Sequence, residues 1–358
     1  MSTFAVLVRR LVVTPHPDAE LLELAQIGGY QAVVGKGQFR TGDLAAYVPE
    51  AALLPADLIE TLGLTGRLAG PESNRVHAIR LRGVLSQGLC LVARPEWMEG
   101  QDVTAELRIT KHVPPIPDDL LGQVRVLEPD EVLKFDVEDI KAFPHVFQEG
   151  EPVVFTEKLH GTFMMAVGLP ARLARHEDGA HPSGRFIVSS KGLMHQRLGF
   201  QHVKENDHNI YLRTAERHHL PEKLMGMAEA HDAAVFALGE VVGGSLQDLA
   251  YGQPGDALAF RVFAMAVGKR FLDDADLEEA LQALDLKRTT VLYRGPFNAD
   301  ALALHTTGKE TLSGRQLHMR EGVVVTPMIE RHDPAIGRAM LRSISPDYLL
   351  RKGGTEFS

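Results

Sequence analysis

A lysine set in a short turn between two apolar runs is the feature of this sequence best suited to covalent chemistry. Lys158 lies in the segment Glu157-Lys158-Leu159-His160-Gly161-Thr162, with apolar residues before and after it. Short apolar runs around a polar turn predict a pair of β-strands. Partial burial of a lysine between strands favours its neutral amine, which is the nucleophilic form. The segment therefore predicts a lysine nucleophile.

A second copy of the lysine pattern occurs in a different context. Glu222-Lys223-Leu224-Met225-Gly226 repeats both the lysine-any-any-glycine spacing and the preceding glutamate. Pro221 and the good helix formers that follow it predict the start of a helix. We therefore interpret Lys223 as a surface helical residue with no chemical role.

Three later stretches carry polar or aromatic residues at predicted strands. One apolar run ends in Glu240, a short aromatic strand ends in Phe263, and Glu321 precedes a β-branched run. Each stretch alone also fits a strand with no functional role, because strands often end in a solvated glutamate or contain a core phenylalanine. Their order after Lys158 is far more specific than any one of them.

These motifs, together with Ser190-Lys191-Gly192, resemble the successive motifs of ATP-dependent RNA ligases. His160 favours that family, because DNA ligases and mRNA capping guanylyltransferases usually have aspartate there, whereas nick-sealing RNA ligases have histidine. The resemblance extends over roughly residues 133–352. With the N-terminal third included, the chain is most similar to the Deinococcus-type RNA ligase, in which an OB module precedes the ligase domain.

The resemblance implies a three-step reaction. Lys158 would attack the α-phosphate of ATP, the AMP would pass to a 5′-phosphate end, and a 3′-hydroxyl would displace it. Glu240 would contact the ribose and Phe263 would stack on adenine. Lys191 would hold phosphate or ribose, and His160 would serve the transfer to the 5′ end. The implied catalytic residues are Lys158, Glu321 and His160, and the implied nucleotide-binding residues are Glu157, Lys158, Gly161, Lys191, Glu240, Phe263 and Arg342.

A divalent cation, Mg²⁺ or Mn²⁺, is expected beside the lysine. Phosphoryl transfer depends on positioning and charge neutralisation, with the metal held by phosphates, water and one or two carboxylates. A bare Glu321 beside Lys158 would favour the charged ammonium, whereas a carboxylate carrying a cation would favour the neutral amine. We therefore predict that Glu321 supports the metal.

Four positions depart from the family pattern. Gly192 stands where related enzymes usually have arginine, and Ala264 replaces an aspartate that commonly follows the stacking aromatic. The last motif normally has two lysines, but here Arg342 takes the first place and Ile344 the second. Arginine keeps the charge of lysine without its compact ammonium. Phosphate contacts in the second and third steps are therefore less well predicted than adenylylation.

Chain length and the spacing of turn-forming residues predict an α+β protein with two domains. At 358 residues the chain has room for about two. Short apolar segments separated by turns predict an OB-like β-barrel over residues 1–112, used for nucleic acid or only for docking. Closely spaced prolines predict a linker over 113–132. Residues 133–358 would form a nucleotidyltransferase domain with antiparallel sheets.

Charge and cysteine content bear on where the protein is located and on what it binds. No apolar run has the length of a membrane span, and the N-terminal residues lack the pattern of a secretory leader. The single Cys90 suits a reducing compartment, so we expect a cytoplasmic protein. We favour a monomer. The net charge of -9 argues mildly against nucleic acid. Local charge matters more, and Arg75, Arg80 and Arg82 form a basic run that is either a phosphate contact or a solvated strand face.

The function expected is ATP-dependent joining of 3′-hydroxyl and 5′-phosphate ends, at nicks in duplexes with an RNA 3′ end. DNA ligase and capping-type guanylyltransferase are the alternatives. Both carry a C-terminal OB domain, for which the sixteen residues after Arg342 leave no room. A non-catalytic nucleic-acid binder is less expected, because the lysine and both glutamates are intact.

Overall fold

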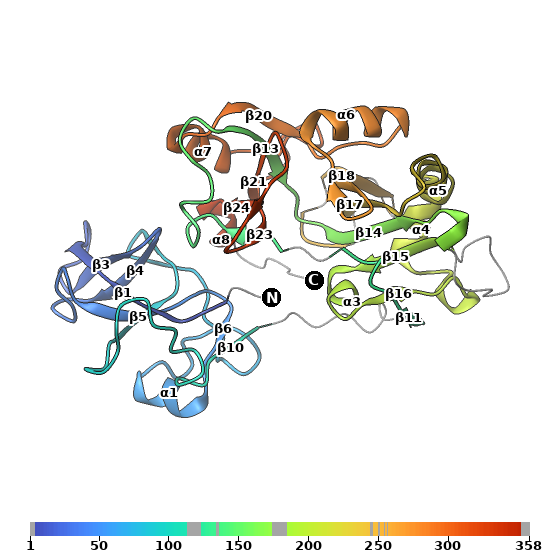
Figure 1. Cartoon of the computed structure of the whole chain (residues 1–358). Coiled ribbons are helices and arrows are strands. Elements are labelled where there is room, and N and C mark those ends of the chain that lie inside the picture. The colour runs from blue at the N-terminus through green and yellow to red at the C-terminus, as the bar shows by residue number, and fades with distance from the viewer. Residues whose placement is uncertain are drawn as a thin grey trace. The chain divides into compact units, whose positions relative to one another are not determined.

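The computed structural model describes residues 4–112, 123–133, 136–173, 185–243, 246–249, 251–253, 255 and 257–351 (Figure 1). The chain forms two compact units. The first comprises residues 1–113, 138–145 and 349–351, and the second comprises 114–137, 146–348 and 352–358. The first ten residues of the expected linker, 113–122, lie outside the described residues.

Short antiparallel strands build the first unit. The sheets have the strand orders β1-β5-β9, β2-β3-β4, β7-β8 and β10-β6. Their bounds are β1 (Leu7–Arg10), β2 (Val12–Pro15), β3 (Leu22–Ile27), β4 (Tyr30–Gly35), β5 (Leu44–Val48), β6 (Ala52–Leu53), β7 (Ile79–Leu81), β8 (Val84–Ser86), β9 (Leu89–Val92) and β10 (Thr110–Lys111), with helix α1 at Ala56–Thr61.

Strand β5 lies between two hydrophobic clusters of the first unit. Ala45 and Tyr47 pack in the cluster that contains Leu11 and Cys90. Ala46 and Val48 pack in the other cluster. Successive side chains of a strand point to opposite faces, so an unbroken apolar run such as β5 is buried on both. Cys90 is a core residue, and burial raises the pKa of its thiol to about 12.

Residues 138–145 belong to the first unit, although they lie beyond the predicted start of the second domain at residue 133. Strand β12 (Glu138–Asp139) begins this segment. Lys141 lies so close to Gly29 that a Cβ at Gly29 would come within 2.8 Å of the lysine Cβ. Lys141 Nζ also donates to Gln87 Oε1 at 2.5 Å. These contacts explain why the segment groups with the barrel strands.

Two antiparallel sheets and several helices build the second unit. One sheet contains β24-β21-β13-β20, and the other has the order β15-β14-β17-β18-β19. The strands are β11 (Val124–Val126), β13 (Pro152–Lys158), β14 (Thr162–Gly168), β15 (Phe186–Ser190), β16 (Leu198–Phe200), β17 (Val235–Gly243), β18 (Leu258–Val267), β19 (Arg270–Phe271), β20 (Val291–Pro296), β21 (Gly322–Pro327), β22 (His332–Asp333), β23 (Gly337–Arg338) and β24 (Leu341–Ile344).

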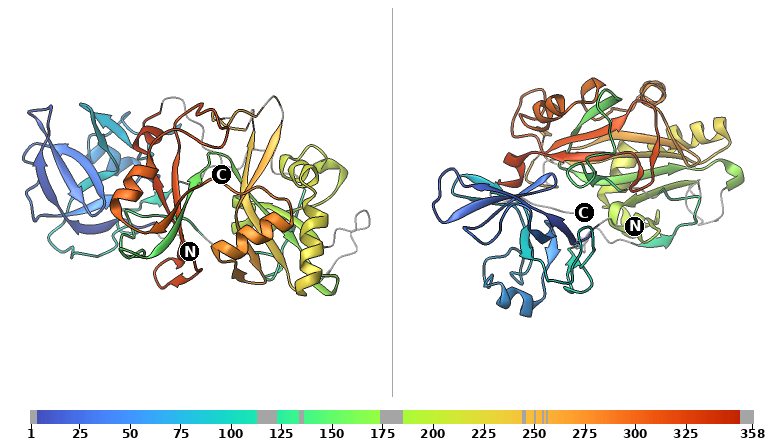
Figure 2. Two further views of the ribbon diagram at one scale, coloured as in Figure 1. Left: turned by 90° about the horizontal axis from the view of Figure 1, so that it is seen from above. Right: turned by 60° about the vertical axis from the view of Figure 1, so that its left-hand side comes forward.

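Helices cover parts of these sheets (Figure 2). They are α3 (Lys191–His195), α4 (Ile210–Arg217), α5 (Leu220–His231), α6 (Asp274–Ala283), α7 (Ala299–Thr306) and α8 (Pro346–Leu349). Lys223 lies in α5, as predicted, and its Nζ donates to the Asp285 carbonyl at 3.1 Å. Within the described residues, no helix combines the length and apolar character needed to cross a membrane.

Strand β14 anchors the turn that carries the lysine motif. Met164 and Ala166 pack beneath α4 and α5, whereas Phe163, Met165 and Val167 face the other cluster. Full burial of one such side chain contributes about 1.5–3 kcal/mol. β13 ends at Lys158 in one sheet and β14 begins at Thr162 in the other. The turn between them therefore lies where the chain passes from one sheet to the other.

Candidate active site

Lys158 and Glu321 form an ion pair at the ends of two neighbouring strands. The register of β13 and β21 pairs Lys158 with Gly322, the residue that follows Glu321. Lys158 Nζ lies 2.6 Å from Glu321 Oε1, and the side chains are 23% and 9% exposed. The backbone pairing therefore brings together two residues more than 160 positions apart.

The second carboxylate oxygen of Glu321, Oε2, is buried and has no hydrogen-bond partner within the protein residues that the structure describes. A buried carboxylate oxygen without a partner is costly, and oxygen is the atom that Mg²⁺ and Mn²⁺ prefer. Glu321 therefore fits the predicted cation. No cluster of three His, Cys, Asp or Glu side chains suited to a metal occurs in the described part of the chain.

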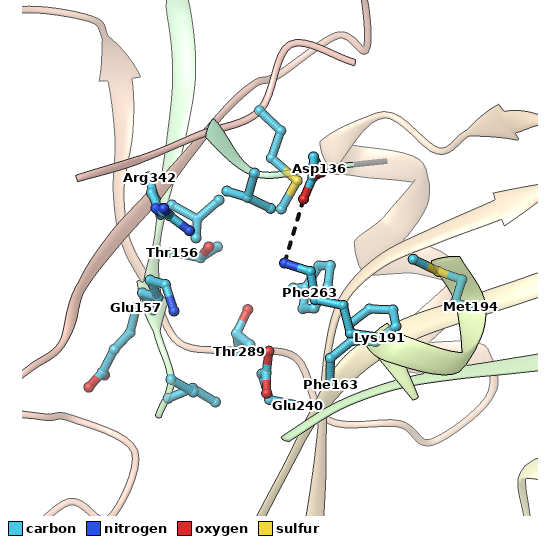
Figure 3. A pocket seen from close by; sticks show the side chains of 15 residues that line it. Asp136, Thr156, Glu157, Phe163, Lys191, Met194, Glu240, Phe263, Thr289 and Arg342 are labelled. Atoms are coloured by element: carbon cyan, nitrogen blue, oxygen red, sulfur yellow. Dashed lines mark ion pairs between the residues drawn. The ribbon is translucent and has the colours of Figure 1, made fainter. Parts of the chain in front are cut away.

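Lys158 lines a pocket that is open to solvent, with an empty volume of about 670 Å³ that includes part of this open space (Figure 3). The lining includes the predicted residues Glu157, Lys158, Lys191, Glu240, Phe263 and Arg342. The other lining residues are Asp136, Val137, Thr156, Leu159, Phe163, Met194, Thr289, Val324 and Met340.

Two further cations line the pocket. Lys191 is the first residue of α3, and its Nζ points toward Asp136, 3.5 Å from Oδ1 (Figure 3). Burial lowers the pKa of Lys191, Asp136 acts against this shift, and Arg342 adds to it. Arg342 lies in β24 opposite Val324, and its Nε has no hydrogen-bond partner among the described residues. These groups suit a ligand with several negative oxygens.

Glu240 lies in β17 beside a break in strand register. The pairing of β17 and β18 shifts between Leu238 and Gly239, and such bulges re-aim the side chains next to them. Burial raises the pKa of Glu240 to about 8, while Lys158 lowers it. The raised pKa favours the protonated form of the carboxyl group. It can then donate a hydrogen bond as well as accept one.

Aromatic and thioether side chains form the apolar wall. The ring centroids of Phe163 and Phe263 are 6.1 Å apart, with the planes inclined by 39°. Met194 and Met340 also line the pocket. A planar heterocycle stacks well on aromatic rings. The pocket therefore offers apolar surface for a flat ring together with charged groups.

Comparison with known proteins agrees with this geometry. Residues 151–341, more than half of the chain, match the family model described as RNA ligase. The chain belongs to the RNA ligase family. Residues 5–93 match an OB-fold domain model. The predicted fold class, an OB-like barrel followed by a ligase nucleotidyltransferase domain with antiparallel sheets, is confirmed. The sequence matches none of the curated proteins.

Solved structures of a Naegleria gruberi RNA ligase are similar over nearly the whole chain. A mutant with ATP and Mn superposes with a TM-score of 0.77 at 23% identity, covering 96% of this chain and 98% of that chain. A second mutant, with AMP and Mn, gives 0.77 at 23% identity over 97% and 98%. The ligase with PPi gives 0.76 at 23% identity over 97% and 98%. These likenesses show the shared fold.

His160 of this RNA ligase family member does not line the pocket. Its Nε2 lies 2.8 Å from Asp248 Oδ1 and its Nδ1 lies 2.7 Å from the Tyr348 hydroxyl. An ionised aspartate only accepts, so Nε2 donates to Asp248. The His160 backbone N–H donates to the Tyr251 hydroxyl at 2.7 Å. These contacts hold the imidazole in one orientation.

Gly161 shapes the turn without lining the pocket. A Cβ at this position would lie 2.5 Å from the Val241 carbonyl oxygen and 3.2 Å from Glu240 Oε2. No real Cβ tolerates the first contact. The close approach of the turn to β17 therefore requires glycine, and it keeps Glu240 next to the lysine segment.

Sequence reasoning missed Thr289, Phe163 and Asp136. Thr289 precedes β20, is 3% exposed, and its Oγ1 has no hydrogen-bond partner among the described residues. No local pattern marks Thr289 or Asp136, since each reaches the pocket only through the tertiary fold. Phe163 had a signal, because it follows the lysine turn in a strand whose alternate residues share a face.

Proposed function

We propose that the protein is an ATP-dependent RNA ligase that works through an enzyme-bound AMP. The Lys158 amine attacks the α-phosphorus of ATP, so that an N–P bond forms, a P–O bond breaks, and pyrophosphate leaves. An oxygen of a 5′-phosphate end then displaces the lysine, which takes up a proton. Finally a 3′-hydroxyl attacks the capped 5′-phosphorus, a phosphodiester forms, and AMP leaves.

The observation that carries the proposal is the Lys158–Glu321 pair at 2.6 Å, with Lys158 in the lining of a pocket that also holds cationic and aromatic side chains. A nucleophile and the group that controls its charge must lie within hydrogen-bond reach. Family membership and the Naegleria gruberi ligase structures with ATP, AMP and Mn support the same nucleotide and cation class here.

Each proposed role follows from the chemistry of a residue that lines the pocket or lies beside it. Phe263, backed by Phe163, stacks on adenine, and Glu240 hydrogen-bonds the ribose. Lys191 and Arg342 bind phosphate oxygens. Glu321, with its unpartnered Oε2, supports Mg²⁺ or Mn²⁺, which when bound neutralises charge on the phosphates. His160 serves transfer of AMP to the 5′ end from outside the nucleotide pocket.

We further propose that the substrate is a nicked duplex with an RNA 3′ end. The OB-fold domain supplies a strand surface of the kind that binds nucleic acid. On this unit Arg80 and Arg82 are exposed, and Arg75 is half-buried. The 2′-hydroxyl is the chemical feature that marks an end as RNA. The single, buried Cys90 accords with a reducing, cytoplasmic setting.

The test is a panel of nicked duplexes that differ only in the sugar of the 3′-terminal nucleotide. We expect sealing to require ATP and a 5′-phosphate, and to favour ribose by about tenfold, the effect of one good hydrogen bond. Equal sealing of all-DNA nicks would move the protein to the DNA ligase class. Covalent labelling by GTP in preference to ATP would indicate a capping-type enzyme.

A further inference from the structure

The carboxylate of Glu157 is buried on the side of β13 away from the pocket. Side chains alternate along a strand, so Thr156 and Lys158 share one side and Glu157 takes the other. The Glu157 side chain is 2% exposed. In Figure 3 its carboxylate points away from Lys191 and Glu240. Proximity to Lys158 in the sequence therefore does not bring the Glu157 side chain to the nucleotide.

Glu157 binds Thr311 instead, through three hydrogen bonds. The Thr311 backbone N–H lies 3.2 Å from Oε1 and 3.0 Å from Oε2, and the Thr311 hydroxyl donates to Oε2 at 2.5 Å. Burial raises the pKa of Glu157, and both kinds of bond from Thr311 act against that shift. The carboxylate thus connects the strand of the nucleophile to a residue far along the chain.

Thr311 lies in the segment 307–320, which joins α7 to β21 and ends directly before Glu321; we name it the Thr311 loop. Glu310 is fully buried and accepts from Ser313 N at 2.9 Å and Leu317 N at 3.0 Å. At the far end, Arg320 donates to the carbonyls of residues 305 and 309 at 2.7 and 3.0 Å. Hydrogen bonds within the loop and to the end of α7 thus connect Thr311 to Arg320, the residue before Glu321.

We propose that Glu157 is a positioning residue: it fixes the Thr311 loop and thereby sets Glu321 beside Lys158, without touching the nucleotide through its side chain. The inference rests on the proposed function, in which Glu321 supports the cation. Groups that orient a metal-binding side chain alter metal affinity or activity by about 10–100-fold when removed. Loss of the Glu157–Thr311 bonds should therefore weaken the response to metal rather than to ATP.

The test compares Thr311→Val with Thr311→Ser in the full-length protein, with Glu157→Ala as a second disruptive variant. Valine removes the hydroxyl at nearly constant volume, whereas serine keeps it. We expect the Mn²⁺ concentration for half-maximal lysyl-AMP formation to rise about tenfold in Thr311→Val and Glu157→Ala. The KM for ATP at saturating Mn²⁺ should change less than about twofold. Thr311→Ser should match the unmodified protein.

Amide hydrogen exchange gives a readout that does not depend on activity. Exchange within the Thr311 loop should accelerate in Thr311→Val, while exchange in β13 stays unchanged. A raised KM for ATP with an unchanged metal requirement would overturn the inference, because the Glu157 side chain would then serve the nucleotide. Unchanged exchange and unchanged kinetics would overturn it too. Failure of the unmodified protein to form any adduct would instead contradict the proposed function.

Discussion

Lys158 Nζ and Glu321 Oε1 lie 2.6 Å apart because β13 and β21 pair the lysine with the residue that follows the glutamate. The amine and the carboxylate are therefore set by a backbone register rather than by a flexible loop alone. A one-residue slip would turn one of the two side chains to the opposite face of the sheet. The arrangement makes the charge on the Lys158 amine depend on the charge of the Glu321 carboxylate.

Glu240 gives the protein a predicted pH dependence of stability. Burial raises its folded-state pKa to about 8, whereas an unfolded glutamate titrates near about 4.3. Between these values the folded state binds more protons, so stability falls as pH rises through that window and then levels off. Glu240→Gln cannot titrate. The melting temperature of the unmodified protein relative to Glu240→Gln should decline from about pH 4.5 to about pH 8; parallel curves would contradict the prediction.

Thr289→Val should have opposite effects on binding and on stability. The hydroxyl has no partner among the described residues, and leaving such a group buried costs about 1 kcal/mol or more. Valine should therefore maintain or raise the melting temperature of the ligand-free protein. If the hydroxyl bonds the nucleotide, KM for ATP should rise about three- to tenfold. Thr289→Ser is the matched control, and an unchanged KM in Thr289→Val would show that the hydroxyl does not contact ATP.

The sequence predicts the site residues that lie on strands or directly beside them better than those that lie in connections. Lys158, Glu240 and Glu321 each stand beside an apolar run, so local pattern located them; Lys158 and Glu240 line the pocket, and Glu321 reaches it through its ion pair with Lys158. Thr289 comes from a connection with no pattern, and only tertiary packing brings it to the pocket. The segment 138–145 groups with the barrel because Lys141 packs on Gly29, a contact that composition does not encode. Strand alternation, which is visible in the sequence, separates Glu157 from Lys158.

His160→Ala should slow the sealing of a pre-adenylated nick. The variant removes an imidazole held between Asp248 and Tyr348, and each hydrogen bond lost costs about 0.5–1.5 kcal/mol of folding free energy. Tyr348→Phe is the companion variant, since it keeps the imidazole and removes one partner. Sealing rates and denaturant unfolding should be measured on both. Normal sealing by His160→Ala would make its role structural.

Neutralising Arg80 and Arg82 should weaken nick sealing and leave lysyl-AMP formation unchanged. Each phosphate contact contributes about 0.9 to the slope of log affinity against log salt, so the slope should fall by up to about two. The matched control replaces Arg10 and Arg108, whose guanidinium groups already pair with carboxylates. An effect of equal size in the control would show that the loss reflects total charge and not a binding surface.

Covalent labelling with radioactive ATP tests the central claim most directly. The protein, Lys158→Ala and Lys223→Ala are each incubated with α-labelled ATP and Mg²⁺ or Mn²⁺, denatured, and separated on a gel. Lys158 ends β13 at the pocket, whereas Lys223 lies in α5 and bonds a backbone carbonyl. We predict that the unmodified protein and Lys223→Ala carry the AMP label and that Lys158→Ala carries none. Label on Lys158→Ala at the level of the unmodified protein would contradict the account.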